Sequence, residues 1–388
     1  MTEIKRVAVI ADSHFDSTPG GRFAECIEVH DWILQDLEAR DNVDLILHAG
    51  DVFERRSTAE ERLAVFSWFQ RAADIAPVVV VRGNHDQPRE LQALTRLQSL
   101  FDIIVEERAG TYAVGGCAVA ALAWPSKASV LAMGATSHQV GEIVAGDALR
   151  AVLRGLGQEM EAVAASTDYD MPRILLMHAM VRGSMTSTGQ PLVGCDLEVG
   201  LDDLALAHAD FIALGHVHKH QDWQASTVYP GSPRRTAFGE VEPKGYVIAN
   251  FRGAEYLSFD RIETPCAPML MVDGTWDESE QAIDWRDDVA GERGADVRLR
   301  YAVPADRREQ AAAAARGARE MLLAQGARSV KTEERVIAAS AARAPEVARA
   351  ATTADKLRAL WAAQDRTPEA ARADGMLCKL CTIEEAAQ

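Results

Sequence analysis

The sequence has no long uninterrupted apolar segment. None of its hydrophobic runs approaches the roughly 18–20 residues that a membrane-spanning helix needs. The opening stretch, MTEIKRVAVIADSH, also lacks the pattern of a cleavable signal and runs directly into a predicted strand. We therefore expect no membrane partner and a cytoplasmic location.

Cysteine is scarce. The 388 residues include six Cys, far below the density of a disulfide scaffold, so that class is excluded and a reducing compartment is expected. Among them, Cys378 and Cys381 have the spacing of a metal-binding pair, which is half of a zinc site. We interpret the pair as a surface or packing feature, because zinc would need ligands from elsewhere or from another chain.

Positive charge is in deficit. The chain has 41 Lys and Arg against 58 Asp and Glu, a net charge of −17. This excludes binding to nucleic acid through the overall field of the protein, because phosphate contacts come from Lys and Arg. Basic residues nevertheless cluster at a few places, namely Arg55 with Arg56, Arg82, Arg89, Lys219, and Arg234 with Arg235.

One run of apolar residues ends abruptly in polar ones. The stretch VVVVRGNHD, residues 78–86, has the four consecutive β-branched residues of a strand that is covered on both faces. Asn84 and His85 therefore follow the carboxyl end of a strand, where Gly83 permits a sharp turn. Ligands bind at that edge of open α/β sheets, although the stretch alone is equally consistent with an ordinary turn.

Four other runs repeat this pattern. The segments VAVIADSH, VDLILHAGD, RILLMHAM and ADFIALGHVH each end a predicted strand in side chains that bind divalent metals. The residues presented are Asp12 and His14, Asp51 after Gly50, His178, and His216 and His218. The other histidines are interpreted as ordinary interior or surface residues, with the face taken by His48 left open: His30, His48, His138, His208 and His220.

The number of candidate ligands predicts two metal ions. A single catalytic ion takes about three ligands from protein, to leave an open position. Here there are seven: Asp12, His14, Asp51, Asn84, His178, His216 and His218. A carboxylate shared between ions roughly 3.5–4 Å apart would complete both coordination shells. We expect Asp51 to be that bridge.

These motifs together resemble a known superfamily. ADSH, GD at 50–51, GNHD at 83–86, His178 and GHVH at 215–218 resemble, in order and spacing, the five motifs of the calcineurin-like metallophosphoesterases. Residues 229–251, YPGSPRRTAFGEVEPKGYVIANF, are similar to the corresponding segment of the SbcD family, the nuclease subunits of SbcC–SbcD DNA repair complexes. The resemblance implies an α/β fold, a metallophosphoesterase β-sandwich flanked by helices, with a small α/β capping domain and a C-terminal helical tail.

The resemblance also implies a role for each site residue. One ion is held by Asp12, His14, Asp51 and His218, and the other by Asp51, Asn84, His178 and His216; both are usually manganese. His85 contacts the scissile phosphate and helps the leaving oxygen depart, a role that suits an imidazole next to a ligand. The candidate DNA contacts are Arg234, Arg235 and Lys219.

The sequence departs from the family pattern in two places. Phe15 and Asp16 stand where Leu and Gly usually follow the first-motif His, so we expect a differently shaped loop. Glu54 stands where archaeal and eukaryotic relatives carry a His, three residues after the second-motif Asp. We therefore expect no second imidazole near the DNA.

The prolines of TPCAPM, residues 264–269, predict a domain boundary. We expect a nuclease domain over 1–265 and a capping domain over 266–337. The latter has strands at MLMVDGTW, DVRLRYAVP and ARSVKTEERVI and an Ala-rich helix closed by Gly326. Residues 338–388 are expected to form a helical tail.

Two protein partners follow from the resemblance. The C-terminal helices, with an apolar stripe of Leu357, Leu360 and Trp361, are expected to bind an SbcC-type coiled-coil ATPase. Residues 307–372 carry 13 Lys or Arg against 8 Asp or Glu, which suits an acidic partner or DNA. A homodimer is also expected, through helices such as 59–73, whose Leu63, Phe66 and Phe69 could equally serve the chain's own core.

Three interpretations of function stand at this point. The leading one is a manganese-dependent DNA nuclease, a double-strand 3'-5' exonuclease and single-strand endonuclease that works with an ATPase in DNA repair and recombination. The alternative is a small-molecule or nucleotide phosphodiesterase or phosphatase on the same scaffold. The third is a scaffold subunit, which has no need of His85. Residues 229–251 and the C-terminal modules favour the nuclease.

Overall fold

The computed structural model describes residues 4–40, 42–134, 142–167, 170–187, 197–224, 226–286 and 293–337, with 347, 350, 352–363, 372–373 and 375–377. His138 and the Cys378 and Cys381 pair lie outside these residues. The chain divides into two compact units. The first comprises Met1–Met271, Gly291–Arg298 and Gly326–Ser329, and the second Val272–Ala290, Leu299–Gln325 and Val330–Gln388.

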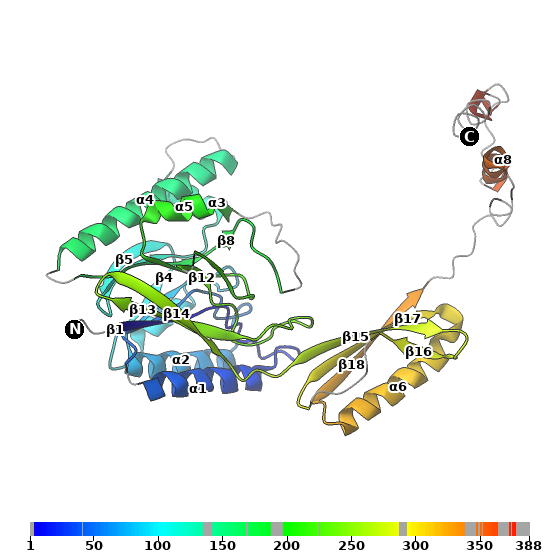
Figure 1. Cartoon of the computed structure of the whole chain (residues 1–388), viewed down its shortest axis with the longest axis horizontal. Helices are drawn as coiled ribbons and strands as arrows, with labels where there is room; N and C mark the ends of the chain where they lie inside the picture. Colours follow the sequence, from blue (N-terminus) through cyan, green and yellow to red (C-terminus); the bar gives the residue numbers. More distant parts are fainter. Residues whose placement is uncertain are drawn as a thin grey trace. The chain divides into compact units, whose positions relative to one another are not determined.

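The first unit is built on two six-stranded sheets (Figure 1). One has the order β14 (Glu255–Glu263), β13 (Gly245–Arg252), β1 (Ile4–Ile10), β2 (Leu45–His48), β3 (Val78–Val81), β4 (Ile103–Glu106). Strands β1 to β4 are parallel, and β13 runs antiparallel to β1.

The second sheet repeats this arrangement around another parallel centre. Its order is β11 (Gln221–Trp223), β12 (Thr227–Tyr229), β10 (Phe211–Gly215), β7 (Arg173–His178), β6 (Cys117–Leu122), β5 (Ala109–Val114). Strands β6, β7, β10 and β12 are parallel, and the two edge strands are antiparallel to their neighbours. A two-stranded sheet pairs β8 (Met180–Val181) with β9 (Glu198–Val199).

The sheets pack face to face as a sandwich. Val7 and Val9 of β1 belong to the core between the sheets, whereas Ala8 and Ile10 belong to the core under the helices. Helices α1 (Phe23–Arg40) and α2 (Ala59–Ile75) cover the first sheet, and α4 (Glu142–Ala165) covers the second (Figure 1). Burial on both faces explains the all-apolar strands, and the predicted β-sandwich flanked by helices is confirmed.

Shorter elements complete this unit. The 3₁₀ segments η1 (Leu91–Arg96) and η2 (Ala205–Ala207) and the helices α3 (Lys127–Gly134) and α5 (Leu201–Leu204) connect the strands. Helix α2 begins at a capping box, in which the Thr58 side chain accepts from the Glu61 amide and Glu61 accepts from the Thr58 amide.

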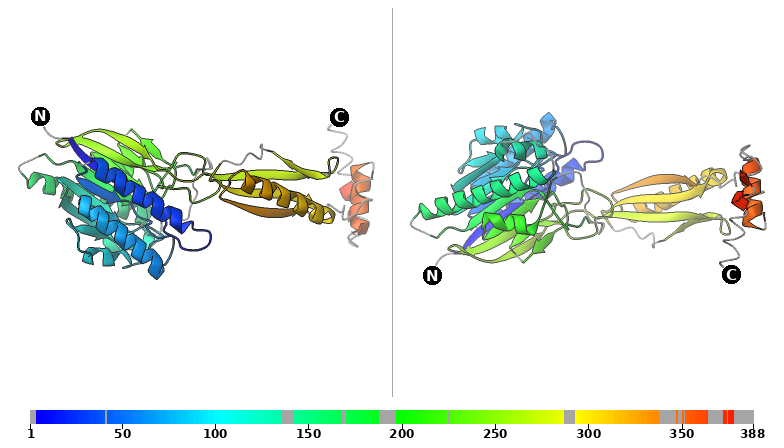
Figure 2. Two further views of the ribbon diagram at one scale, coloured as in Figure 1. Left: turned by 90° about the horizontal axis from the view of Figure 1, so that it is seen from below. Right: turned by 90° about the horizontal axis from the view of Figure 1, so that it is seen from above.

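The second unit is organised around a four-stranded sheet and one helix. The sheet has the order β16 (Ala282–Trp285), β15 (Met269–Asp277), β17 (Asp296–Pro304), β18 (Ser329–Ile337). Helix α6 (Arg308–Ala324), preceded by η3 (Ala305–Arg307), runs along the sheet (Figure 2). Its Ala311 and Ala315 pack on Trp276, Ile283 and Tyr301. In the following segment, α8 (Thr353–Ala363) carries the apolar stripe at Leu357 to Trp361.

A buried ion network ties α1 to the segments 293–298 and 326–329 of the first unit. Glu25 and Asp296 are each 5% exposed and face two guanidinium groups. Arg22 pairs with both carboxylates, with its Nε 2.9 Å from Asp296 Oδ2, and Arg328 Nη2 lies 2.9 Å from Glu25 Oε2. Arg328 also pairs with Asp296, and the Ala267 amide donates to Glu25.

Glu25→Ala is expected to lower the free energy of unfolding by about 3 kcal/mol, because it leaves two guanidinium groups facing one carboxylate. Glu28→Ala, on the exposed face of the same helix, should change it by less than about 0.5 kcal/mol. Denaturant unfolding of both variants checks this. If Glu25→Ala were as stable as the wild type, water would have to replace the lost carboxylate as the partner of Arg22 and Arg328.

Candidate metal centre

Five strands deliver polar side chains to one region of the sandwich. Asp12 and His14 follow β1, Asp51 follows β2, and Asn84 follows β3. In the opposite sheet, His178 ends β7, and His216 and His218 follow β10. Parallel strands end at the same edge of their sheet, so each sheet presents its polar residues together, as the sequence predicts.

The described residues gather into groups whose candidate ligand atoms lie within 4.8 Å of one another. One group is Asp12, His14 and His218, and another is Asp51, His178 and His216. The Asn84 Oδ1 atom lies 2.9 Å from His178 Nε2 and 3.0 Å from His216 Nδ1, which places it with the second group. All seven predicted ligands therefore lie together.

Asp51 belongs to the second group and also faces the first. Its Oδ2 atom is 3.8 Å from His14 Nε2 in the first group and 3.4 Å from His178 Nε2 in the second. Burial opposes ionisation of Asp51, but the neighbouring imidazoles outweigh it and hold the pKa of this carboxyl well below its usual range. The position and charge are those required of a bridging carboxylate.

Bonds on the far side of the ring fix the orientation of two of the candidate ligand imidazoles, His178 and His218. His178 Nδ1 donates to the Ala49 carbonyl over 2.7 Å, which directs Nε2 at Asp51 and Asn84. His218 Nδ1 lies 2.9 Å from Thr236 Oγ1, which in turn donates to Glu240 Oε1 over 3.2 Å. A second bond of this kind is what holds a ligating His in one tautomer and rotamer.

The ligand residues occupy a strained backbone. Asp12, His14, Asp51 and His216 all have positive φ, at 53°, 46°, 53° and 109°. Non-glycine residues with positive φ are uncommon and cost free energy, so they persist where the surroundings impose them. Here backbone bonds join the loops, from the Asp12 amide to Gly50 over 3.0 Å and from His14 to Asp51 over 3.1 Å.

Two glycines allow these loops to approach one another. Gly50 has φ of +88°, and a Cβ there would lie 2.6 Å from His178 Nδ1. A Cβ on Gly83 would collide with the side chain and amide of Asp51. Neither position accepts a larger residue without moving a candidate ligand.

The donor set fits divalent cations. The buried Asp12 Oδ2 has no hydrogen-bond partner among the described residues, although its Oδ1 accepts from the His216 amide over 2.9 Å. His14 Nε2 and His218 Nε2 face each other at 3.0 Å. Converging nitrogens beside an unpaired carboxylate oxygen provide a mixed N and O coordination sphere, which suits Mn²⁺ and neighbouring metals.

His85 belongs to neither of these two groups, although its ring lies with His14 and Glu54 in a third set of candidate ligand atoms. Its amide donates to Asp51 Oδ1 over 2.9 Å, and its Nδ1 donates to the Glu54 carbonyl over 2.7 Å. The side chain is 37% exposed, and its ring meets that of His14 edge-on at 5.0 Å. With Nδ1 committed, Nε2 is the atom that can meet a substrate.

Sequence reasoning missed three residues that contact the ligands. The Glu54 carboxylate lies 2.7 Å from His14 Nδ1, and this hydrogen bond lowers the pKa of Glu54. Trp124 packs against His216 with ring centroids 4.7 Å apart. Burial opposes ionisation of Glu240, but its bond to His218 and the Lys244 charge lower its pKa to about 2. Of these three residues, only Glu54 had a signal in the sequence, namely its position three residues after Asp51.

Two of the histidines outside the motifs form a buried chain behind the ligands. His30 Nδ1 donates to the Cys26 carbonyl over 2.7 Å, and its Nε2 accepts from Ser13 Oγ over 2.8 Å. His48 Nε2 completes the chain by donating to the same hydroxyl over 2.8 Å. Ser13 lies between two predicted ligands, so this chain supports the ligand loop. His208 is exposed and His220 half-buried.

This chain predicts a pH dependence of stability. Burial lowers the pKa of both His30 and His48 to about 3. Below the unfolded value of about 6.5 the unfolded chain binds protons that the folded chain does not, so stability falls as pH falls, by about 1.4 kcal/mol per pH unit for each group.

His48→Gln should therefore flatten the dependence of unfolding free energy on pH by about 1.4 kcal/mol per unit between pH 6 and 4. Denaturant unfolding with a chelator present measures it. The exposed His208→Gln is the control and should leave the slope unchanged. An unchanged slope for His48→Gln would mean that His48 is charged in the folded protein.

The predicted DNA contacts lie in different settings. Arg234 is buried, at 3% exposed, and its Nη2 donates to the His14 carbonyl over 2.7 Å. Arg235 donates to the carbonyls of Glu240 and Glu242 over 2.8 and 3.1 Å. Both guanidinium groups thus support protein loops in this structure. Lys219 is half-buried on the segment after His218.

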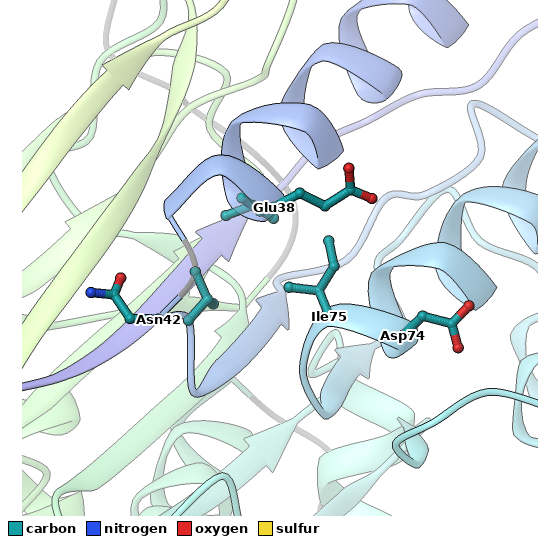
Figure 3. Close-up of a pocket in the computed structure, with 6 residues that line it drawn as sticks. Glu38, Asn42, Asp74 and Ile75 are labelled. Atoms are coloured by element: carbon teal, nitrogen blue, oxygen red, sulfur yellow. The ribbon is translucent and has the colours of Figure 1, made fainter.

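Cavities lie at both ends of the strands. One, of about 350 Å³, adjoins His216 and His218. Another, of about 330 Å³, lies between the C-terminal ends of α1 and α2, around Glu38, Asn42, Asp74 and Ile75 (Figure 3). Asn42 and Ile75 precede β2 and β3, so this second cavity is at the strands' amino ends, away from the ligands. No helix among the described residues is both long and apolar enough to span a membrane.

Comparison with known families agrees with this geometry. Residues 5–220 match the calcineurin-like phosphoesterase family, which covers every candidate metal ligand. The chain belongs to the calcineurin-like phosphoesterases.

Within that family, the similar curated proteins are named as the SbcD component of the nuclease SbcCD. The chain is 31% identical to the one from Rhodobacter capsulatus, over 61% of this chain and 64% of that protein. Identity is 26% to those of Bacillus subtilis and Escherichia coli K12, over 61% and 66% of this chain and 63% and 68% of theirs. The match thus spans somewhat under two thirds of the first two relatives, and the resemblance to SbcD is confirmed over that length.

Proposed function

We propose that this protein is a metal-dependent DNA nuclease. The observation that supports it most is the arrangement of two ligand groups about Asp51, with His85 beside them and outside both. Two-metal sites of this kind serve in-line displacement at phosphorus. The similarity to SbcD proteins favours DNA as the substrate.

Each predicted ligand has a place in this proposal. Asp12, His14, Asp51 and His218 would hold one divalent ion, and Asp51, Asn84, His178 and His216 the other, with manganese the expected metal. Bound ions would supply positive charge at the phosphodiester and lower the pKa of water for attack. The contacts of Ala49, Thr236 and Glu54 hold the His178, His218 and His14 rings in the orientation in which they would bind the ions.

His85 would serve the leaving group. Its Nδ1 donates to the Glu54 carbonyl, which fixes the ring and turns Nε2 outward. An imidazolium proton at Nε2 would stabilise the phosphate oxygen and then pass to the departing sugar oxygen. His14 packs edge-on against this ring and limits its rotation.

The finer expectations form part of the same proposal. Residues 1–265 would be the nuclease domain, 266–337 a cap that positions DNA, and 338–388 the tail that binds an SbcC-type coiled-coil ATPase. Activity would be 3'-5' exonucleolytic on duplexes and endonucleolytic on single strands, in a cytoplasmic complex. A homodimer would use α2, where Leu63 is 73% exposed, whereas Phe69 is buried in the chain's own core.

The experiment is cleavage of end-labelled linear DNA by the purified protein with Mn²⁺, Mg²⁺ or chelator, beside a nucleotide phosphodiester. Cleavage of DNA that requires Mn²⁺ supports the proposal. If the protein hydrolyses the small phosphodiester but leaves DNA intact, even when an SbcC-type partner and ATP are supplied, the nuclease proposal fails. The small-molecule phosphodiesterase would then be the better interpretation.

A further inference from the structure

The cavity of about 350 Å³ shares part of its wall with the candidate metal centre. His216 and His218 line it on one side, and Ala237 and Phe238 line it on another. Its volume is at the lower end of the range for small-molecule sites, roughly 300–1,000 Å³. Whatever occupies this cavity therefore lies directly beside the candidate metal centre.

The loop that carries Phe238 is held firmly. The Glu240 carboxylate accepts from the Thr236 amide over 3.1 Å and pairs with Lys244 Nζ at 2.9 Å. Arg235 donates to the Glu240 carbonyl over 2.8 Å. The guanidinium carbon of Arg298 lies 4.3 Å from the centroid of the Phe238 ring. The ring is thus positioned before any ligand arrives.

The cavity wall combines apolar side chains with polar groups that already have partners. Glu240 lines the cavity, but its carboxylate is engaged by the Thr236 amide and by the Lys244 ammonium. Val217, Ala237 and Phe238 are apolar, and Ser187 adds a hydroxyl that donates to Glu242 over 2.6 Å. A flat, neutral ring that offers its apolar face matches these walls.

We propose that this cavity is a nucleobase subsite, in which Phe238 contacts the base of a nucleotide next to the scissile phosphodiester. The inference rests on the proposed function, since the base arrives attached to the phosphate at the metal centre. Because every base has an aromatic face, the subsite accepts all of them and anchors a splayed strand without reading sequence.

The test compares Phe238→Ala and Phe238→Leu with wild type on single-stranded DNA. The substrates are a series of strands, each with one abasic nucleotide at a different position on either side of the cleavage site. Leu keeps apolar bulk without the aromatic face, and Val241→Ala, an exposed apolar truncation nearby, is the matched control. Phe238→Trp tests rescue by a larger aromatic ring.

We expect kcat/KM on intact strands to fall about tenfold in both Phe238 variants and to be retained in Phe238→Trp. When the abasic nucleotide stands at the position that enters the subsite, kcat/KM of the wild type should also fall about tenfold. At that position kcat/KM of the Phe238 variants should be no lower than on intact strands. The subsite would be overturned if the Phe238 substitutions lowered kcat/KM by the same factor on intact strands and on every abasic strand, or if they did not lower it at all. If wild type cleaves no strand, the proposed function itself fails.

Discussion

Asp51→Ala is expected to lower the rate of metal-dependent phosphodiester hydrolysis by roughly a thousandfold, because the metals contribute several kcal/mol of transition-state stabilisation. The reason lies in its position: it belongs to the second ligand group, 3.4 Å from His178 Nε2, and also lies 3.8 Å from His14 Nε2 of the first. Its loss should also reduce bound metal, measured by elemental analysis after gel filtration.

Asp74→Ala is the matched control for this prediction. Asp74 is an exposed carboxylate at the second cavity, at the amino ends of the strands, and should leave rate and metal content unchanged. A full metal complement with normal activity in Asp51→Ala would exclude a bridging role. Loss of one ion with the other retained would assign Asp51 to a single group.

His85→Gln is expected to lower kcat by about 10²–10⁴-fold while the bound metal stays unchanged. The structure separates these effects, since His85 donates from Nδ1 to the Glu54 carbonyl and lies outside the two groups around Asp51. His208→Gln, on an exposed imidazole, is the control.

A second substrate distinguishes proton donation from structural support. A phosphodiester with a p-nitrophenolate leaving group needs little protonation, so His85→Gln should slow its hydrolysis far less than that of DNA. Equal loss on both substrates would mean that His85 acts by positioning phosphate. Loss of metal together with activity would place it among the ligands.

The candidate ligands could be predicted from the sequence because their signals are local. A strand buried on both faces is a continuous apolar run, and the residue after it is presented at the carboxyl edge. Val78 to Val81 forms β3 as predicted, and β17 covers the predicted Asp296 to Pro304. Five such runs predict seven candidate ligands without any knowledge of the strand order.

Other features had no local signal. Glu54 reads as a departure from the family, yet its side chain reaches His14 Nδ1 and its carbonyl holds His85. The resemblance makes Arg234 and Arg235 candidate DNA contacts, yet in the structure both guanidinium groups donate to backbone carbonyls. Charge in a sequence does not state whether a guanidinium faces solvent or a buried loop.

The sequence by itself determined which residues are candidate metal ligands, because ligand type and strand ends are properties of short segments. The tertiary structure alone decided their partners, since His14 meets His218 across 204 positions and Asn84 meets His178 across 94. It also decided that the His30 and His48 imidazoles share the Ser13 hydroxyl, and that Phe238 borders the same cavity as His216. Such contacts depend on how the two sheets pack and on which polar groups become buried away from water. The whole chain determines both.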